Sequence, residues 1–226
     1  TPVSPTAAGL TDLWVFEGTE LLAHQTSGDA NFGSPEIELT YGQHAITFVG
    51  SSVESQAFTE GVWSGKDAKD CFGYVHNIKV TSTTGEQNVV LTRCYYAVQW
   101  VSEDVVPTSA ASVEVTVSNY RKTLLSGLNG GEIVPKNISA GLSKFAGINV
   151  VTVSAYGFTA EYGTEEIVHT TYTIKDANKN VIYQHEKDVP ILSGRATIIK
   201  GNMFGTPASA AINVDNADLT KYEIKL

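Results

Sequence analysis

NVVLTRCYYAVQWVSEDVVP, residues 88–107, is the densest apolar and aromatic run in the chain. Its apolar residues occupy both even-numbered positions, such as Val90, Tyr96 and Trp100, and odd-numbered positions, such as Leu91 and Val101. In a strand these two sets point to opposite faces. Apolar positions on both parities, rich in β-branched and aromatic types, are typical of a strand buried on both faces. The run ends at Pro107 and passes into a small polar stretch. It predicts one central strand that closes a domain near the middle of the chain.

The length of the chain fits two domains joined at that point. Domains typically hold roughly 100 to 200 residues, and the chain has 226. We expect an N-terminal β-sandwich over residues 1–106 and a C-terminal β-sandwich over residues 107–226, the second ending in an edge strand.

Short strands separated by turns recur outside the central run. Residues 113–117 alternate strictly between valine and polar residues, which predicts a half-buried strand. Residues 36–49 read as a hairpin that turns at Gly42, and residues 81–87 and 176–180 read as hairpin loops. No amphipathic helix of three turns is evident. The sequence therefore predicts an all-β protein built from two tandem β-sandwiches.

The last residues carry the clearest alternation in the chain. Tyr222, Ile224 and Leu226 are apolar, while the residues between them are charged. Such a pattern predicts an edge strand with a charged outer face. This strand either closes its own sheet or is donated to another subunit, and self-closure is the simpler expectation.

Composition is typical of an extracellular β-protein more than of a cytosolic enzyme. Charged residues make up 17% of the chain and the net charge is −9, against roughly 25% charged residues in average domains. An acidic chain is a poor partner for nucleic acid or an anionic membrane surface. The chain contains no apolar run long enough to span a bilayer. Residues 1–6 do not resemble a signal peptide, so an export signal, and any lipid anchor that ties the protein to a membrane, is expected upstream of Thr1.

No pattern of catalytic or metal-binding residues stands out. The five histidines are dispersed, and there is no G-x-S-x-G or nucleophilic Cys/His pairing. Asp176 opens a segment like the first half of a calcium loop, but Val181 stands where that loop requires glycine. We therefore predict no catalytic residues, no metal ligands and no cofactor, and a protein that is not an enzyme.

Two further features leave alternatives open. Cys71 and Cys94 both lie in predicted strands of the first domain, where either a disulfide or a pair of buried thiols fits. Trp63 has glycine and serine neighbours, so it either covers one end of a sandwich or stacks on a sugar ring. In the second case Phe58 and Tyr74 would complete a glycan platform.

Several segments resemble the fimbrillin-like proteins, the shaft, tip and anchor subunits of type V pili from anaerobic gut and oral bacteria of the Bacteroidales. The most specific segment is the L-x-R-x-x-x-A pattern at Leu91, Arg93 and Ala97, which leads to Asp104 and Pro107. A closing pattern follows at Val189-Pro190, Arg195-x-Thr197 and Gly201-x-x-Phe204.

The resemblance implies sandwiches of transthyretin-like, Greek-key type and export as an outer membrane lipoprotein. It also implies assembly into a fimbrium by β-strand addition between pilus subunits, and contact with host or bacterial surface receptors. In such pilins a trypsin-like protease removes an N-terminal strand. The first basic residue here is Lys66, so cleavage is expected upstream of Thr1 or not at all.

The leading hypothesis is a non-enzymatic fimbrial subunit or adhesin at the cell surface. The alternative is a surface glycan-binding β-sandwich protein. The first predicts buried aromatic residues and an exchangeable terminal strand, whereas the second predicts coplanar exposed aromatic residues.

Overall fold

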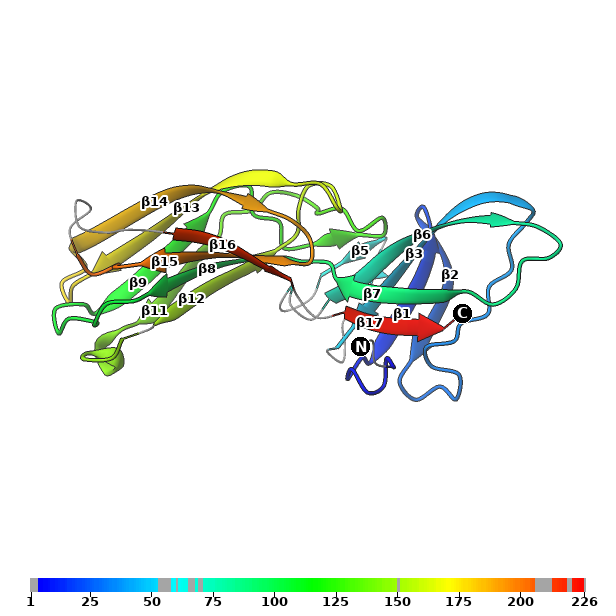
Figure 1. Cartoon of the computed structure of the whole chain (residues 1–226), viewed down its shortest axis with the longest axis horizontal. Helices are drawn as coiled ribbons and strands as arrows, with labels where there is room; N and C mark the ends of the chain where they lie inside the picture. Colours follow the sequence, from blue (N-terminus) through cyan, green and yellow to red (C-terminus); the bar gives the residue numbers. More distant parts are fainter. Residues whose placement is uncertain are drawn as a thin grey trace.

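The computed structural model describes residues 4–52, 58–59, 61–64, 68, 71–149, 151–205 and, for the backbone alone, 213–218 and 221–225. The regular secondary structure of these residues is almost entirely β-strand, and η2 (Ser143–Phe145) is a short 3-10 helix. The strands form two bodies that lie end to end along the long axis of the molecule (Figure 1). The predicted all-β sandwich fold is confirmed.

The first body is built on a six-stranded antiparallel sheet with the order β17-β7-β6-β3-β1-β2. Its strands are β1 (Asp12–Glu17), β2 (Glu20–Thr26), β3 (Gly42–Ser51), β6 (Cys71–Val80), β7 (Asn88–Arg93) and β17 (Lys221–Lys225). One face of this sheet packs on residues 4–11 and 27–41, which contain no strand, around a core that includes Leu13, Phe48 and Leu91. A small sheet with the order β10-β5-β4 pairs β4 (Phe58–Thr59), β5 (Val62–Trp63) and β10 (Leu124–Leu125).

The second body is a sandwich of two four-stranded sheets. One has the order β11-β9-β13-β14 and the other β12-β8-β15-β16. Their strands are β8 (Tyr96–Ser102), β9 (Ser112–Val117), β11 (Asn137–Gly141), β12 (Thr152–Gly157), β13 (Glu166–Lys175), β14 (Val181–Ile191), β15 (Arg195–Gly201) and β16 (Asn213–Asp218). All pairs are antiparallel except β8 with β15. The rings of Trp100 and Tyr172 pack in the core between the sheets, with their centroids 5.4 Å apart and their planes tilted by 35°.

The run at residues 88–107 is not one strand, contrary to the prediction. β7 ends at Arg93, β8 begins at Tyr96, and the two belong to different bodies. The apolar residues on both parities arise because alternate β7 residues face the first core, whereas β8 is buried in the second. Division of the chain into domains at residue 106 stays a prediction, but the sheets themselves part between β7 and β8.

A third cluster of buried side chains joins residues from both halves of the chain. Its buried members are Trp14, Phe16, Val49, Trp63, Ala68, Cys71, Cys94, Tyr95, Leu124, Leu128 and Phe158. Leu128 adopts a φ of 66°, and a Cβ on Gly73 would lie 2.6 Å from its side chain. Glycine is therefore needed at position 73 for this close approach. We call this cluster the junction core.

Local predictions had mixed outcomes. The alternation at residues 113–117 forms β9, and its valines are buried. The loop at 176–180 joins β13 to β14, and Asp176 accepts hydrogen bonds from the backbone of Asn178 and Asn180. The hairpin predicted at residues 36–49 is wrong. Residues 35–41 form no strand, because Ile37 and Leu39 pack as coil on the face of the six-stranded sheet.

Candidate functional site

The C-terminal segment places a strand at the edge of each body in succession. The backbone of β16 pairs antiparallel with β15, and that of β17 pairs antiparallel with β7. Tyr222 lies opposite Leu91 and Ile224 opposite Val89, while Leu226 falls outside the described residues. β17 therefore lies at a sheet edge within its own chain, and a donor role for Tyr222, Ile224 and Leu226 stays a prediction.

β7 depends on β17 for most of its backbone pairing. β17 pairs with β7 along its whole length, from Lys221 opposite Thr92 to Lys225 opposite Asn88. On its other side β7 pairs with β6 at two positions, Phe72 opposite Arg93 and Gly73 opposite Thr92. Removal of β17 would therefore leave most backbone groups of β7 in need of a new strand partner.

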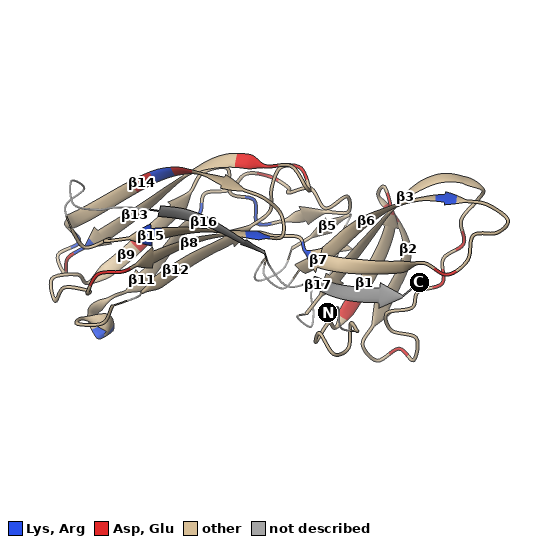
Figure 2. Cartoon of the chain, in the orientation of Figure 1, with Lys and Arg blue, Asp and Glu red and all other residues tan. Residues whose placement is uncertain are grey.

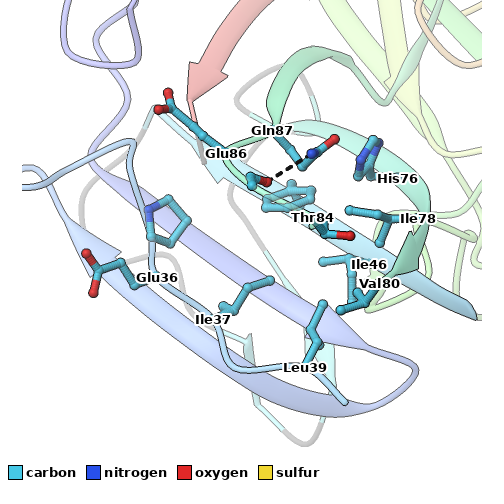
Figure 3. A pocket seen from close by; sticks show the side chains of 13 residues that line it. Glu36, Ile37, Leu39, Ile46, His76, Ile78, Val80, Thr84, Glu86 and Gln87 are labelled. Atoms are coloured by element: carbon cyan, nitrogen blue, oxygen red, sulfur yellow. Dashed lines mark hydrogen bonds between the residues drawn. The ribbon is translucent and has the colours of Figure 1, made fainter. Parts of the chain in front are cut away.

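An apolar groove of about 310 Å³ opens beside the hairpin that leads into β7 (Figure 3). Its apolar lining comes from the 35–41 segment, β3 and β6 and includes Ile37, Leu39, Ile46, Phe48, Ile78 and Val80. Glu36, Glu86 and Gln87 form a polar rim. The groove has room for a few apolar side chains of an extended segment. The alternation of Ile37 and Leu39 was a signal for this groove, but alone it resembles that of a strand.

His44 ties one wall of this groove to β3. Its Nδ1 lies 2.8 Å from a Glu17 carboxylate oxygen and its Nε2 2.9 Å from the Thr40 carbonyl. The hydrogen bond with Glu17, followed by that with Thr40, raises the pKa of His44 above its usual 6.5. Imidazolium can donate to both acceptors at once, whereas neutral imidazole donates to one of them.

We expect the contribution of His44 to stability to fall as pH rises. A histidine whose folded pKa is raised contributes fully below pH 6.5, and the contribution is lost as pH rises through the higher folded pKa. NMR titration of the ring should give a pKa above 6.5, and the His44→Gln variant should lack this part of the pH dependence of Tm. A ring pKa at or below 6.5 would contradict the expectation.

The chain is fixed immediately ahead of the C-terminal segment. The Asp104 carboxylate accepts hydrogen bonds from the backbone N–H groups of Met203 at 2.9 Å and Phe204 at 2.8 Å. The His185 ring lies 2.9 Å from the Met203 carbonyl oxygen. Met203 and Phe204 have 0% and 7% of their surface exposed. The segment that follows therefore starts from an anchored point, which we call the Asp104 clamp.

Arg93 holds the point where the chain passes between the two bodies. Its guanidinium lies 4.8 Å from the centre of the Phe72 ring and donates a hydrogen bond of 2.7 Å to the Tyr95 hydroxyl. Burial raises the pKa of Tyr95 to about 12, although Arg93 opposes the shift by favouring the phenolate. Tyr95 remains a neutral phenol at physiological pH, and Arg93 thus orders the turn between β7 and β8.

The predicted glycan platform is wrong at its central residue. Trp63 has no exposed surface, because β5 lies between β4 and β10 and the ring packs edge-on against Phe158 at 5.8 Å. Phe58 is half-buried and packs against Trp14 and Phe16. Of the three predicted residues Tyr74 alone is exposed, by 38%. These aromatic residues therefore do not form one exposed face.

The remaining predicted site is the cysteine pair. Cys71 and Cys94 are both fully buried in the junction core, and the Cys94 thiol lies 3.2 Å from the Cys71 sulfur. The structure brings these two residues together as a pair of buried thiols, and a disulfide between them stays a prediction.

The described part of the chain contains neither a cluster of metal ligands nor a membrane-spanning helix. Within the described ranges, no three His, Cys, Asp or Glu side chains gather to hold a metal ion. No helix in the described part of the chain is long and apolar enough to cross a membrane.

Solved structures with a similar fold come from Bacteroides and Porphyromonas. The tip fimbrial protein Mfa3 from Porphyromonas gingivalis, with a C-terminal truncation, superposes with a TM-score of 0.51 at 12% identity, over 93% of this chain and 94% of that one. A candidate adhesin from Bacteroides thetaiotaomicron gives 0.51 at 9% identity, over 94% and 90%. Candidate polysaccharide binding proteins from the same organism give 0.50 at 11% identity, over 94% and 90%. The resemblance to fimbrillin-like proteins is thus confirmed at the level of the fold.

Sequence comparison gives a narrower assignment. No curated protein sequence matches the chain significantly. One family model matches residues 48–218, which is well over half of the chain and covers the second body and part of the first. The chain therefore belongs to the Family of unknown function (DUF6562).

Proposed function

We propose that this protein is a non-enzymatic fimbrial subunit or adhesin of the bacterial cell surface that assembles by exchanging its C-terminal strands between subunits. The observation that carries the proposal is the pairing of β7. It shares a full-length ladder with β17 and two positions with β6. The same segment supplies an edge strand, β16, to the second body.

The exchange is physically plausible because it conserves interactions. A β17 strand from another subunit would make the same backbone hydrogen bonds to β7 as the chain's own strand, so the equilibrium depends mainly on effective concentration. The alternation of apolar Tyr222 and Ile224 with charged residues gives the donated strand one apolar face. The apolar groove beside the hairpin offers further contacts to a longer extended segment.

Charge distribution is a minor factor in this pairing. The described basic residues between positions 4 and 93 are Lys79 and Arg93, whereas acidic residues are more numerous (Figure 2). The terminal strand carries Lys221, Glu223 and Lys225, one positive charge in excess. Because that excess is small, electrostatic attraction contributes little to encounter, and backbone pairing carries the proposal.

The partners in this proposal are other subunits of the same surface structure and, at its exposed end, host or bacterial receptors. The similar folds of a fimbrial tip protein and a candidate adhesin support it. Attachment to the outer membrane through a lipid carried ahead of Thr1 belongs to the same proposal. Immunolabelling of intact cells tests the surface location.

Truncation after Gly205 tests strand exchange directly. We expect the intact chain to form oligomers whose mass, measured by light scattering, rises with concentration. The truncated chain should remain a monomer and should bind one synthetic peptide of residues 206–226, with a gain in Tm. A peptide of the same composition in scrambled order is the matched control, because it lacks the alternation.

If the intact and truncated chains are both monomers at high concentration, and the truncated chain does not bind the peptide, then the terminal strands serve only to close their own sheets. Loss of stability alone on truncation would support that simpler role.

A further inference from the structure

Cys71 and Cys94 meet at the base of the β6–β7 hairpin. Cys71 is the first residue of β6 and Cys94 directly follows β7. The Cys94 backbone N–H donates to the Cys71 carbonyl at 3.4 Å, and the two sulfur atoms lie 3.2 Å apart. Both residues are fully buried.

We propose that Cys71 and Cys94 are joined by a disulfide bond in the exported protein. The inference rests on the surface location given under the proposed function, because disulfides form and persist in oxidising compartments. A disulfide requires sulfur atoms about 2.05 Å apart, so the present 3.2 Å needs a closure of about one ångström by side-chain rotation.

The chemistry is thiol–disulfide exchange with an oxidised dithiol oxidoreductase. The thiolate of one cysteine attacks the disulfide of that enzyme and forms a mixed disulfide, and the second cysteine then displaces the enzyme. The two protein thiols lose two protons and two electrons, and the enzyme's disulfide is reduced to a dithiol. Because both sulfur atoms are buried, the bond must form before the junction core closes or during a local opening.

The bond would reinforce the weakest backbone connection of β7. The two β6–β7 ladder positions, Phe72 with Arg93 and Gly73 with Thr92, directly adjoin the cysteines. A covalent link here keeps β7 attached to β6 even while its other neighbour, β17, is absent. The disulfide would thus hold the acceptor strand in place during strand exchange.

The test compares the protein secreted into a bacterial periplasm with the double variant Cys71→Ala/Cys94→Ala. Wild-type protein that is denatured and then treated with an alkylating reagent is expected to take up none of the reagent. Its mass should be lower than that of the reduced chain by two hydrogen atoms. Reduction and refolding in the presence of reductant should lower its Tm by about 5–10 °C, as expected for a loop of this size. The double variant should have the same Tm with and without reductant.

Two alkylated cysteines per chain in the denatured wild-type protein would overturn the proposal. So would a Tm that does not respond to reductant. The truncation experiment, repeated on the double variant, keeps the two proposals separate. Oligomers of that variant support strand exchange whatever the state of the cysteines, and a disulfide in a strictly monomeric wild-type protein supports the bond alone.

Discussion

The Trp63→Ala variant is expected to lose about 3–5 kcal/mol of unfolding free energy, the usual cost of truncating a fully buried tryptophan. Trp63 has no exposed surface and packs against Phe158 in the junction core. β5 also pairs Trp63 with Leu124, a residue beyond β8 and β9 in the chain. The cavity would therefore weaken contacts between residues from both halves of the molecule.

Denaturant unfolding followed by circular dichroism and by fluorescence measures this effect. We expect a single transition for the wild-type chain, because the junction core couples the two bodies, and a broadened or split transition for Trp63→Ala. A loss below about 1 kcal/mol, with one sharp transition retained, would show that Trp63 does not couple them.

The matched control is Trp63→Phe. The Trp63 Nε1 is buried and finds no hydrogen-bond partner among the described residues, so phenylalanine removes an unsatisfied donor while it keeps a ring against Phe158. We expect this variant to lose less than about 1.5 kcal/mol. Both variants lack the Nε1 group, so the difference between their free energies of unfolding measures the contribution of the ring that phenylalanine retains.

The burial of Trp63 also shows where sequence patterns stop being informative. Its flanking glycine and serine residues predict a loop, and β5 is two residues long. What buries Trp63 is pairing with β10, from a Gly-rich segment much later in the chain. Local periodicity carries no information about such long-range contacts, so the sequence left a sugar-binding role open beside the packing role that the burial of Trp63 favours.

Elements defined by local chemistry were predictable. The valines of β9 alternate because one face of that strand meets the core, and Asp176 nucleates its turn with hydrogen bonds to residues two and four positions later. The alternation of the terminal strand likewise predicts an edge. It does not say which sheet has that edge, because β16 and β17 pair with strands of different bodies.

The break between β7 and β8 was hidden for a related reason. Apolar residues on both parities describe one strand buried on both faces, or two successive strands that face different cores. The sequence offers Arg93 as a signal for the second case, because a charged side chain is costly inside a doubly buried strand. In the structure its guanidinium lies over Phe72 and bonds Tyr95 at the crossing.

Contacts in the structure explain why the two sequence patterns that resemble fimbrillin-like proteins occur together. Asp104 and Phe204 lie far apart in sequence and were noted as parts of two separate patterns. The structure joins them, since the Asp104 carboxylate accepts the Phe204 backbone N–H at 2.8 Å. The same carboxylate accepts the N–H of Met203. Two patterns thus describe one anchor for the segment that leads to β16.

The Asp104→Ala variant is expected to destabilise the protein by about 2–4 kcal/mol. It removes an acceptor that serves two backbone N–H groups of buried residues, and a hydrogen bond to a charged acceptor contributes about 1.5–3 kcal/mol. Denaturant unfolding measures the loss, and hydrogen exchange at Met203 and Phe204 locates it. Asp104→Asn keeps an oxygen acceptor for one of the two N–H groups and sets an amide NH2 donor against the other, so it should lose at least about half as much.

The rate of strand exchange separates an anchoring role from a purely structural one. Two batches of the protein, each labelled with a different fluorophore, form mixed oligomers when strands exchange between subunits. If the Asp104 clamp restrains the start of the C-terminal segment, this mixing should be faster in the Asp104→Ala variant than in the wild type. A neighbouring control is Glu103→Ala, because Glu103 is exposed and contacts Gly201 through its backbone N–H alone. Faster mixing in Asp104→Ala with wild-type mixing in Glu103→Ala would assign the restraint to the carboxylate. Equal mixing rates in all three proteins would limit Asp104 to stabilising the second body, because a loosened clamp would then have no effect on release of the strands.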